Sequence, residues 1–184
     1  MAPPVILAEV KTMSPFGFVS PYCWDDLFAI AAEAGDMISI HTDARWGGSW
    51  DILERARKMT YKPILAKGIH ASDDEVRKAV ELGAAYVLVV GRMSGVYREQ
   101  CIIEPQSLTD FLWIPDGQRV MWNSRDLDTG GTKRETFAEA RARWSGWLCQ
   151  ASNVLSLDDV HPQADAVLVG TYLKEFAESM HKDI

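Results

Sequence analysis

Short apolar runs of strand length recur along the chain, and most are separated by segments whose apolar residues follow the helical period. The run at residues 86–90, Tyr-Val-Leu-Val-Val, is apolar throughout, which is typical of a parallel strand covered on both faces. The pattern predicts strands at residues 5–11, 37–42, 63–67, 86–90, 101–104, 119–123, 147–150 and 166–170.

Helices are predicted between most of these runs. Residues 24–34 carry apolar side chains at helical spacing. Ser72-Asp-Asp-Glu75 has the form of a capping box, so a helix should begin there, run to residue 82 and end before Gly83. Further helices are expected at residues 49–59, 133–144 and 172–180.

This alternation of strand and helix predicts one α/β domain over residues 1–184, a (β/α)8 TIM barrel. Such barrels typically have about 200 or more residues, so this one must be shortened. Residues 93–100 and 107–116 leave room for little more than a turn or two, and Pro115 would end a helix in the second segment. We therefore expect reduced helices after the fourth and fifth strands. An open doubly wound sheet is the alternative, although no glycine-rich dinucleotide motif follows the first run.

Polar side chains close most of the predicted strands. In a parallel barrel the carboxyl ends of the strands form the active-site face. Taken singly, each residue also has a structural explanation; Arg125 and Asp126, for example, could form an ion pair that rigidifies their loop. Their convergence at one barrel mouth favours a shared site. The residues concerned are Glu9, Lys11, Lys67, Glu104, Asn123, Arg125 and Gln150.

Gly170 and Thr171 follow the last strand and precede a predicted helix. The free N–H groups at a helix start attract anions, and barrels often bind phosphate after strands seven and eight. Glycine followed by an N-capping threonine is also ordinary helix punctuation. Gly170 and Thr171 are therefore candidates for phosphate binding only in combination with the polar residues at the other strand ends.

The composition of the chain disfavours several classes of function and of site. The formal net charge of −7 argues against binding to nucleic acid or to an anionic membrane surface. No apolar run approaches the ~18 residues of a membrane span, and no signal-like segment opens the chain, so a cytoplasmic location is expected. Cys23, Cys101 and Cys149 are far apart and form no CxxC pair, which disfavours a zinc site or disulfide framework. Cys101 and Cys149 are expected to be buried in strands.

Several of these segments resemble indole-3-glycerol phosphate synthase, the decarboxylating cyclase of tryptophan biosynthesis. The resemblance runs with gaps from Val5 to about Leu173. Asn123-Ser-Arg-Asp-Leu127, which begins at the end of the sixth strand, matches the family's motif there almost letter for letter. The other similar segments are Ile6–Lys11 with Ser14-Pro15, Trp46-Gly-Gly-Ser49, Pro63–Lys67, Leu82–Val90 and Ala166–Gly170.

The resemblance implies a role for each candidate residue. Lys67 would protonate the ketone oxygen of a carboxyphenylamino-deoxyribulose phosphate, Lys11 would hold the carboxylate, and Glu104 would transfer protons during dehydration. No metal or organic cofactor is implied, and the partner would be a phosphorylated small molecule. Substrate contacts would come from Glu9, Ser14, Trp46, Asn123, Arg125, Gln150, Gly170 and Thr171.

The chain also departs from the family pattern. We expect the family's extra N-terminal helix to be absent. Gln150-Ala151-Ser152 replaces the usual Glu-Ser-Gly, Ile69 replaces an aromatic ring, and Phe16 replaces a small residue. Three hypotheses follow: a shortened synthase, a paralogue acting on a different aryl- or sugar-phosphate substrate, and a non-catalytic barrel that binds a partner. Because reduced helices would uncover apolar strand faces, a homo-oligomer or a partner protein is a further expectation.

Overall fold

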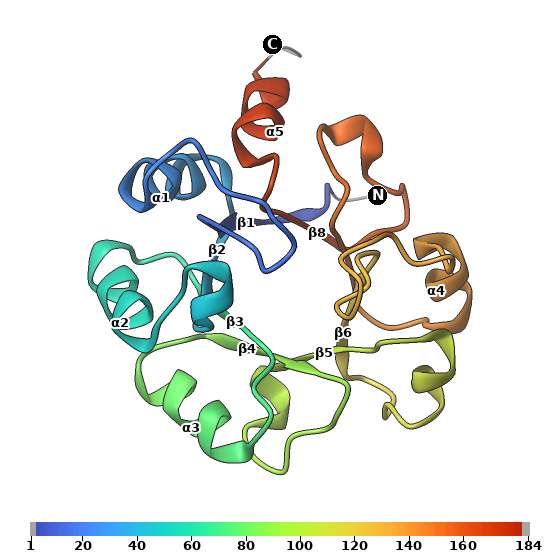
Figure 1. Cartoon of the computed structure of the whole chain (residues 1–184). Helices are drawn as coiled ribbons and strands as arrows, with labels where there is room; N and C mark the ends of the chain where they lie inside the picture. Colours follow the sequence, from blue (N-terminus) through green and yellow to red (C-terminus); the bar gives the residue numbers. More distant parts are fainter. Residues whose placement is uncertain (1–2, 182–184) are drawn as a thin grey trace.

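The computed structural model describes residues 3–181, and its strands close into a barrel (Figure 1). Every neighbouring pair is parallel, and the last strand pairs with the first, Val5 opposite Ala166. A (β/α)8 architecture is thereby confirmed and the open-sheet alternative is wrong. The strands are β1 (Val5–Val10), β2 (Met37–His41), β3 (Ile64–Lys67), β4 (Tyr86–Val90), β5 (Cys101–Glu104), β6 (Arg119–Asn123), β7 (Leu148–Ala151) and β8 (Ala166–Val169).

Five α-helices surround the described barrel, and their starts follow the capping chemistry of the sequence. The predicted capping box is present at α3, where Ser72 and Glu75 exchange hydrogen bonds with each other's backbone. The helix predicted at 133–144 is shorter than expected, because Thr136 and Glu139 form a capping box that delays its start. The helices are α1 (Trp24–Ala34), α2 (Trp50–Met59), α3 (Asp73–Glu81), α4 (Phe137–Arg143) and α5 (Leu173–Met180).

The connections after β4 and β5 are as short as predicted, with only 3-10 turns at Arg98–Gln100 and Leu108–Leu112. The expectation that this uncovers the strand faces is wrong. Outward side chains such as Ile103 and Val120 are fully buried, because Phe111 and its neighbours pack over them. A homo-oligomer or a partner protein remains a prediction, but uncovered strand faces no longer support it.

Alternate residues of each strand point into the barrel, as strand geometry requires. The lower interior is apolar, and its members include Leu7, Leu65, Ile102 and Cys149. Two residues further along these strands, the inward positions of β1, β3 and β5 carry the charged side chains Glu9, Lys67 and Glu104. The corresponding position of β7 is Ala151. The next interior positions, on the even-numbered strands, are His41, Val90, Asn123 and Gly170. Cys101 and Cys149 are buried as predicted.

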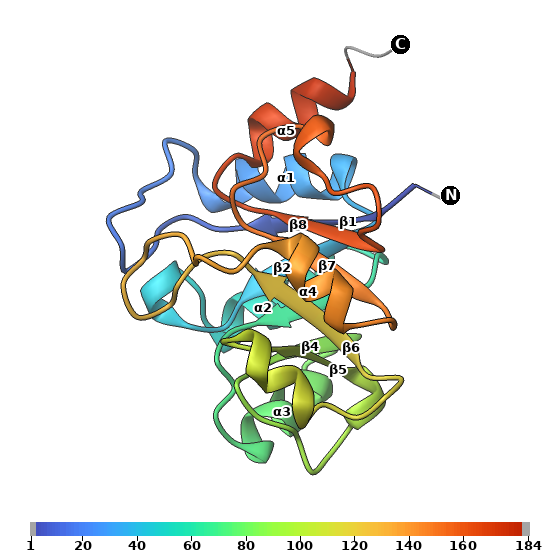
Figure 2. The same cartoon turned by 90° about the vertical axis from the view of Figure 1, so that its right-hand side faces the viewer.

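Two long loops extend from the barrel on one side (Figure 2), residues 11–23 after β1 and 124–136 after β6. They meet at Gly130, where an added Cβ would lie only 2.5 Å from the ring of Phe16. Both loops follow the carboxyl ends of their strands, so they frame the active-site face.

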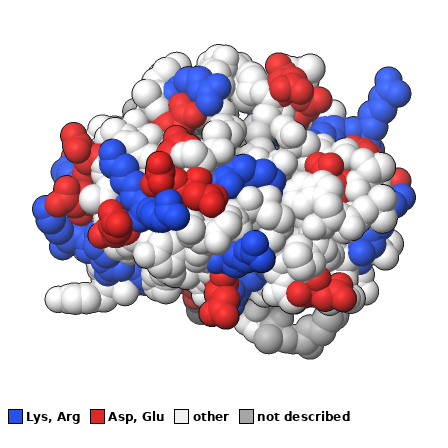
Figure 3. Space-filling model, turned by 90° about the horizontal axis from the view of Figure 1, so that it is seen from below, with Lys and Arg blue, Asp and Glu red and all other residues white. Residues whose placement is uncertain are grey.

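Among residues 3–181, no helix combines the length and the apolar character needed to cross a bilayer. The face seen in Figure 3 carries both charge signs interspersed, without a continuous basic stripe.

Candidate active site

Glu9 is the centre of a buried ion pair at the barrel mouth. Its Oε2 accepts from Nζ of Lys67 at 3.1 Å, and its Oε1 lies 2.5 Å from Nε2 of His41. Burial by itself would raise the pKa of the Glu9 carboxyl, but Lys67, Lys11 and His41 outweigh that effect and hold the pKa well below its ordinary value. Glu9 is therefore an ionised carboxylate that fixes the Lys67 amine in place.

Lys11 extends past the end of β1 and places a second amine in the mouth. Burial lowers the pKa of Lys11; Glu9 opposes this, while Lys67 and Arg125 add to the lowering. The Lys11 amine also lies 5.3 Å from the centre of the Phe18 ring. Lys11 consequently shares the cavity with two other cationic side chains, Lys67 and Arg125, which suits it to bind a further anion.

Glu104 faces these lysines from the opposite side of the barrel. It is 2% exposed, and its Oε1 accepts from Nδ2 of Asn123 at 2.9 Å. Burial raises the pKa of Glu104, although Lys67 and the Asn123 hydrogen bond pull in the other direction. Glu104 can thus hold a proton at pH values where an exposed glutamate has lost it, which is what a general acid needs.

Asn123 connects Glu104 to the loop after β6. Its Oδ1 accepts from the backbone N–H of Arg125 at 3.0 Å and from Oγ of Ser152 at 2.7 Å. The Arg125 guanidinium donates to the carbonyl of Gly130 at 2.6 Å, so it braces its own loop. An ion pair between Arg125 and Asp126 does not form; the Asp126 carboxylate instead accepts backbone N–H groups of residues 128 and 129.

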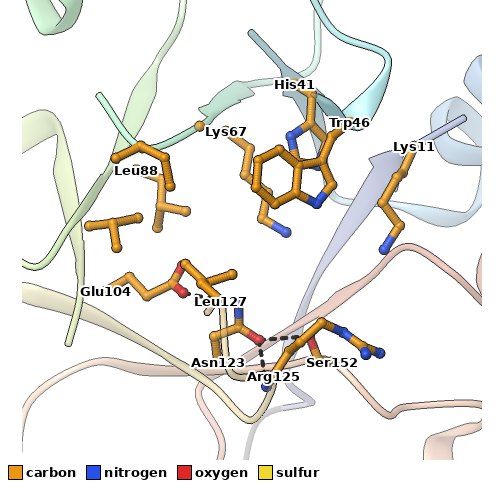
Figure 4. A pocket seen from close by; sticks show the side chains of 13 residues that line it. Lys11, His41, Trp46, Lys67, Leu88, Glu104, Asn123, Arg125, Leu127 and Ser152 are labelled. Atoms are coloured by element: carbon orange, nitrogen blue, oxygen red, sulfur yellow. Dashed lines mark hydrogen bonds between the residues drawn. The ribbon is translucent and has the colours of Figure 1, made fainter. Parts of the chain in front are cut away.

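Apart from Glu9, which lies beneath Lys67, the charged and polar groups of the mouth line one cavity of about 440 Å³, measured with its open mouth (Figure 4). The amines of Lys11 and Lys67 and the carboxyl of Glu104 point toward its centre. The remaining wall is largely apolar, so the cavity places an apolar surface next to charged groups. The apolar lining residues are Trp46, Ile69, Leu88, Val90 and Leu127.

A smaller hollow adjoins the cavity between the ends of β1, β7 and β8. Gly170 and Thr171 line it together with Ser152, and Lys11 and Arg125 border both spaces. A side chain at position 170 would collide with Glu9, because an added Cβ would lie 2.7 Å from its carboxyl carbon. Helix α5 begins at Leu173, two residues later than Thr171. The hollow thus offers backbone and two cations to a small anion, and the Glu9 carboxylate also lines it.

Two sequence candidates lie outside these spaces. Gln150 points out of the barrel, because its side chain accepts from the N–H of His161 and donates to the carbonyl of Asp159. The cavity side of β7 belongs to Ala151. The Ser14 hydroxyl accepts N–H groups within its own turn.

His41 and Ser152 line the cavity and were missed by the sequence reasoning. The signal for His41 was available, since it stands two residues beyond Ser39 at the end of a strand whose residues 38 and 40 are apolar. The remaining candidates meet as predicted: Lys11, Trp46, Lys67, Glu104, Asn123 and Arg125 in the cavity, Glu9 beneath Lys67, and Gly170 and Thr171 in the adjoining hollow.

Comparisons with known proteins give distant sequence relatives. The chain is 24% identical over 186 residues to the tryptophan biosynthesis protein TrpCD of Archaeoglobus fulgidus, a match covering 90% of this chain and 34% of that protein. It is 37% identical over 92 residues to the indole-3-glycerol phosphate synthase of Pyrococcus furiosus, covering 48% and 40% of the two chains. The enzyme of that name from Sulfurisphaera tokodaii is 32% identical over 87 residues, covering 46% and 35%.

The matches therefore span between 34% and 40% of the length of these relatives. No family model matches the chain. Among solved structures, 3-hexulose-6-phosphate synthase superposes with a TM-score of 0.69 at 16% identity, covering 95% of this chain and 99% of that one. At this identity the superposition establishes the barrel fold alone.

Proposed function

We propose that this chain catalyses the decarboxylating ring closure of a carboxyphenylamino-deoxyribulose phosphate to indole-3-glycerol phosphate. One observation carries the proposal: an amine fixed by a buried carboxylate, Lys67 on Glu9, faces a buried carboxyl of raised pKa, Glu104, across a cavity with an apolar wall. The partial sequence similarity to indole-3-glycerol phosphate synthases supports the same reaction.

Lys67 would act first. As the ring carbon that bears the carboxylate attacks the ketone carbon, a new C–C bond forms and the ketone oxygen takes a proton from the Lys67 ammonium group. Lys11 would hold the carboxylate during this step, and loss of CO2 then restores the aromatic ring. The apolar wall at Leu88 and Val90 would hold the ring while keeping water away from it.

Glu104 would act in the dehydration. Its proton would go to the hydroxyl formed from the ketone, which leaves as water, while the neighbouring CH2 gives a proton to the Lys67 amine, which the first step left neutral, and the indole double bond closes. The raised pKa of Glu104 supports this donor role, and Asn123 holds the carboxyl through a 2.9 Å hydrogen bond. Overall, one CO2 and one water leave for each indole formed.

The hollow at Gly170 and Thr171 would take the phosphate end of the substrate. Lys11 and Arg125 border this hollow, and anions bind well to exposed backbone N–H groups near cations. This assignment sets the direction of the substrate: the phosphate lies beside β8, and the aryl ring lies against β3 and β4.

A second candidate is a related ring closure on a different aryl- or sugar-phosphate. Ala151 favours it, because the inward position at the end of β7 carries no hydrogen-bonding group for a sugar hydroxyl. Ile69 also offers an aliphatic surface rather than a stacking ring. Under this reading Lys11, Lys67 and Glu104 keep their roles and only the bound groups differ.

The test is to mix purified protein with the carboxyphenylamino-deoxyribulose phosphate and to record indole fluorescence. Turnover that is lost in Lys67→Met and Glu104→Gln but retained in Lys62→Met would support the proposal. Lys62 is a matched control because its amine binds the carbonyls of Ala32 and Gly35, away from the cavity. A wild-type protein that neither turns over this substrate nor binds its reduced analogue in calorimetry would refute it. Binding without turnover would favour the second candidate.

A further inference from the structure

His41 is a buried histidine at the barrel mouth for which the proposed reaction has no step. It is the last residue of β2, is 3% exposed and lines the same cavity as Lys11 and Lys67. Buried polar side chains usually have hydrogen-bond partners and a reason to be there. The surroundings of its ring identify that reason.

The contact with Glu9 fixes the protonation of the ring. Because the pKa of Glu9 lies well below its ordinary value, its carboxylate can only accept, so Nε2 of His41 must carry the hydrogen of their 2.5 Å contact. Burial lowers the pKa of His41, and Lys67 and Lys11 act in the same direction against the opposing effect of Glu9. The ring is therefore neutral near pH 7, with a bare Nδ1 that has no hydrogen-bond partner among the described residues.

The orientation of the ring is fixed by the loop after β2. The indole of Trp46 stacks parallel to the imidazole, with an interplanar angle of 1° and 5.7 Å between ring centres. Gly48 lets the chain fold back this closely, since an added Cβ there would lie 2.7 Å from Cβ of His41. The loop is held by Asp43, whose carbonyl accepts from the N–H groups of Trp46 and Gly48. A ring held by its edge and its face has little freedom to rotate.

Glu9 in turn has one oxygen for each partner. Oε1 accepts from His41 and Oε2 from Lys67, so the carboxylate is held from both sides. Without the His41 hydrogen bond the carboxylate could rotate about its last bond, and the amine of Lys67 would follow it. Errors of about 1 Å in the placement of a reacting group can cost about 100-fold in rate.

We propose that His41 is a positioning residue that holds the Glu9 carboxylate in the rotamer that aims the Lys67 amine into the cavity. Its effect on turnover rests on the proposed function, whereas its bond to Glu9 does not. The Nε2–H of His41 is the required group, and another side chain that places an N–H at this point should serve in its place.

The experiment compares His41→Gln, whose amide can still donate to Glu9, with the apolar His41→Leu. His161→Leu is the matched control, because His161 packs on Phe137 outside the cavity. We expect kcat to fall about 10- to 100-fold in His41→Leu with KM within about threefold of wild type, and most of the loss to be recovered in His41→Gln. His41→Leu within twofold of wild type, or His41→Gln as slow as His41→Leu, would overturn the proposal.

A second readout needs no turnover. In protein labelled with ¹⁵N-histidine, NMR near pH 7 should show His41 as the Nε2–H tautomer, and Glu9→Gln should move that resonance while leaving His161 unchanged. An Nδ1–H tautomer, or a resonance that ignores Glu9→Gln, would refute the inference. Absence of turnover in the wild type would instead refute the proposed function, and the tautomer would still decide the role of His41.

Discussion

Replacing Lys67 with methionine tests the buried ion pair most sharply, because it removes one charge and keeps most of the volume. Glu9 then remains ionised at 1% exposure with Lys11 and His41 as its other neighbours. Removing one partner of a buried pair costs about 3–5 kcal/mol. The low end applies here, since Lys67 borders an open cavity and its side chain is 12% exposed.

About 3 kcal/mol lowers the melting temperature of a chain of this size by about 6–12 °C. The loss should depend on pH in a defined direction. The folded pKa of Glu9 is depressed, so its contribution is complete above the ordinary glutamate pKa of about 4.3 and is lost as the pH falls through the folded value. Thermal denaturation of Lys67→Met should therefore show its full deficit at pH 7 and a smaller one in acid.

The double variant Glu9→Gln/Lys67→Met supplies the control. It removes both charges, so it should be less destabilised than the sum of the single variants by more than about 1 kcal/mol. Strictly additive losses, or a Lys67→Met melting temperature within 1 °C of wild type, would contradict the coupling between these side chains. A deficit that grew in acid would contradict the assigned charge of Glu9.

Three further variants test other parts of the site. The melting temperature of Glu104→Gln should rise relative to that of wild type as the pH increases from 4 to 8. Burial raises the pKa of Glu104, so ionising this carboxyl at higher pH costs the wild-type protein stability. A difference in melting temperature that does not change with pH would refute this prediction. Gly170→Ala should lose about 1–3 kcal/mol of stability and also lose substrate turnover, because the added methyl group displaces Glu9. The control Gly131→Ala should lose neither, since its added Cβ makes only an ordinary contact. Equal effects of the two substitutions would contradict the close contact between Gly170 and Glu9. Gln150→Ala should lose about 1–2 kcal/mol of stability from two hydrogen bonds, with KM unchanged; a KM raised tenfold would return Gln150 to the site.

The barrel was predictable because parallel strands covered on both faces are read from sequence as apolar runs. Each predicted strand agrees with the structure to within about two residues, and the capping box at Ser72 marks the start of α3. Apolar spacing places the start of α4 at residue 133 rather than at Phe137, because the capping box of Thr136 and Glu139 sets that start. The backbone N–H of Lys133 turns back to the carbonyl of Ser124, a contact that closes the loop only once β6 is in place.

Because these strands are apolar on both faces, the sequence does not show which of their residues face into the barrel. On an amphipathic strand, alternation distinguishes the two faces, but β7 reads Leu-Cys-Gln-Ala and is buried on both sides. Its facing is set by pairing with β6 and β8, which turns Ala151 inward and Gln150 out. The lysines were found because a charged residue at the end of an apolar strand is conspicuous. His41 is less conspicuous, and its importance depends on Glu9 and Trp46 lying against it.

The stoichiometry of the reaction tests the proposed decarboxylating ring closure. Wild-type protein is incubated with carboxyphenylamino-deoxyribulose phosphate labelled in the carboxyl carbon, and labelled CO2 and indole product are measured from the same reaction. We predict one CO2 for each indole, with both lost together in Lys67→Met. Release of CO2 without indole, or neither product from folded wild-type protein, would contradict it.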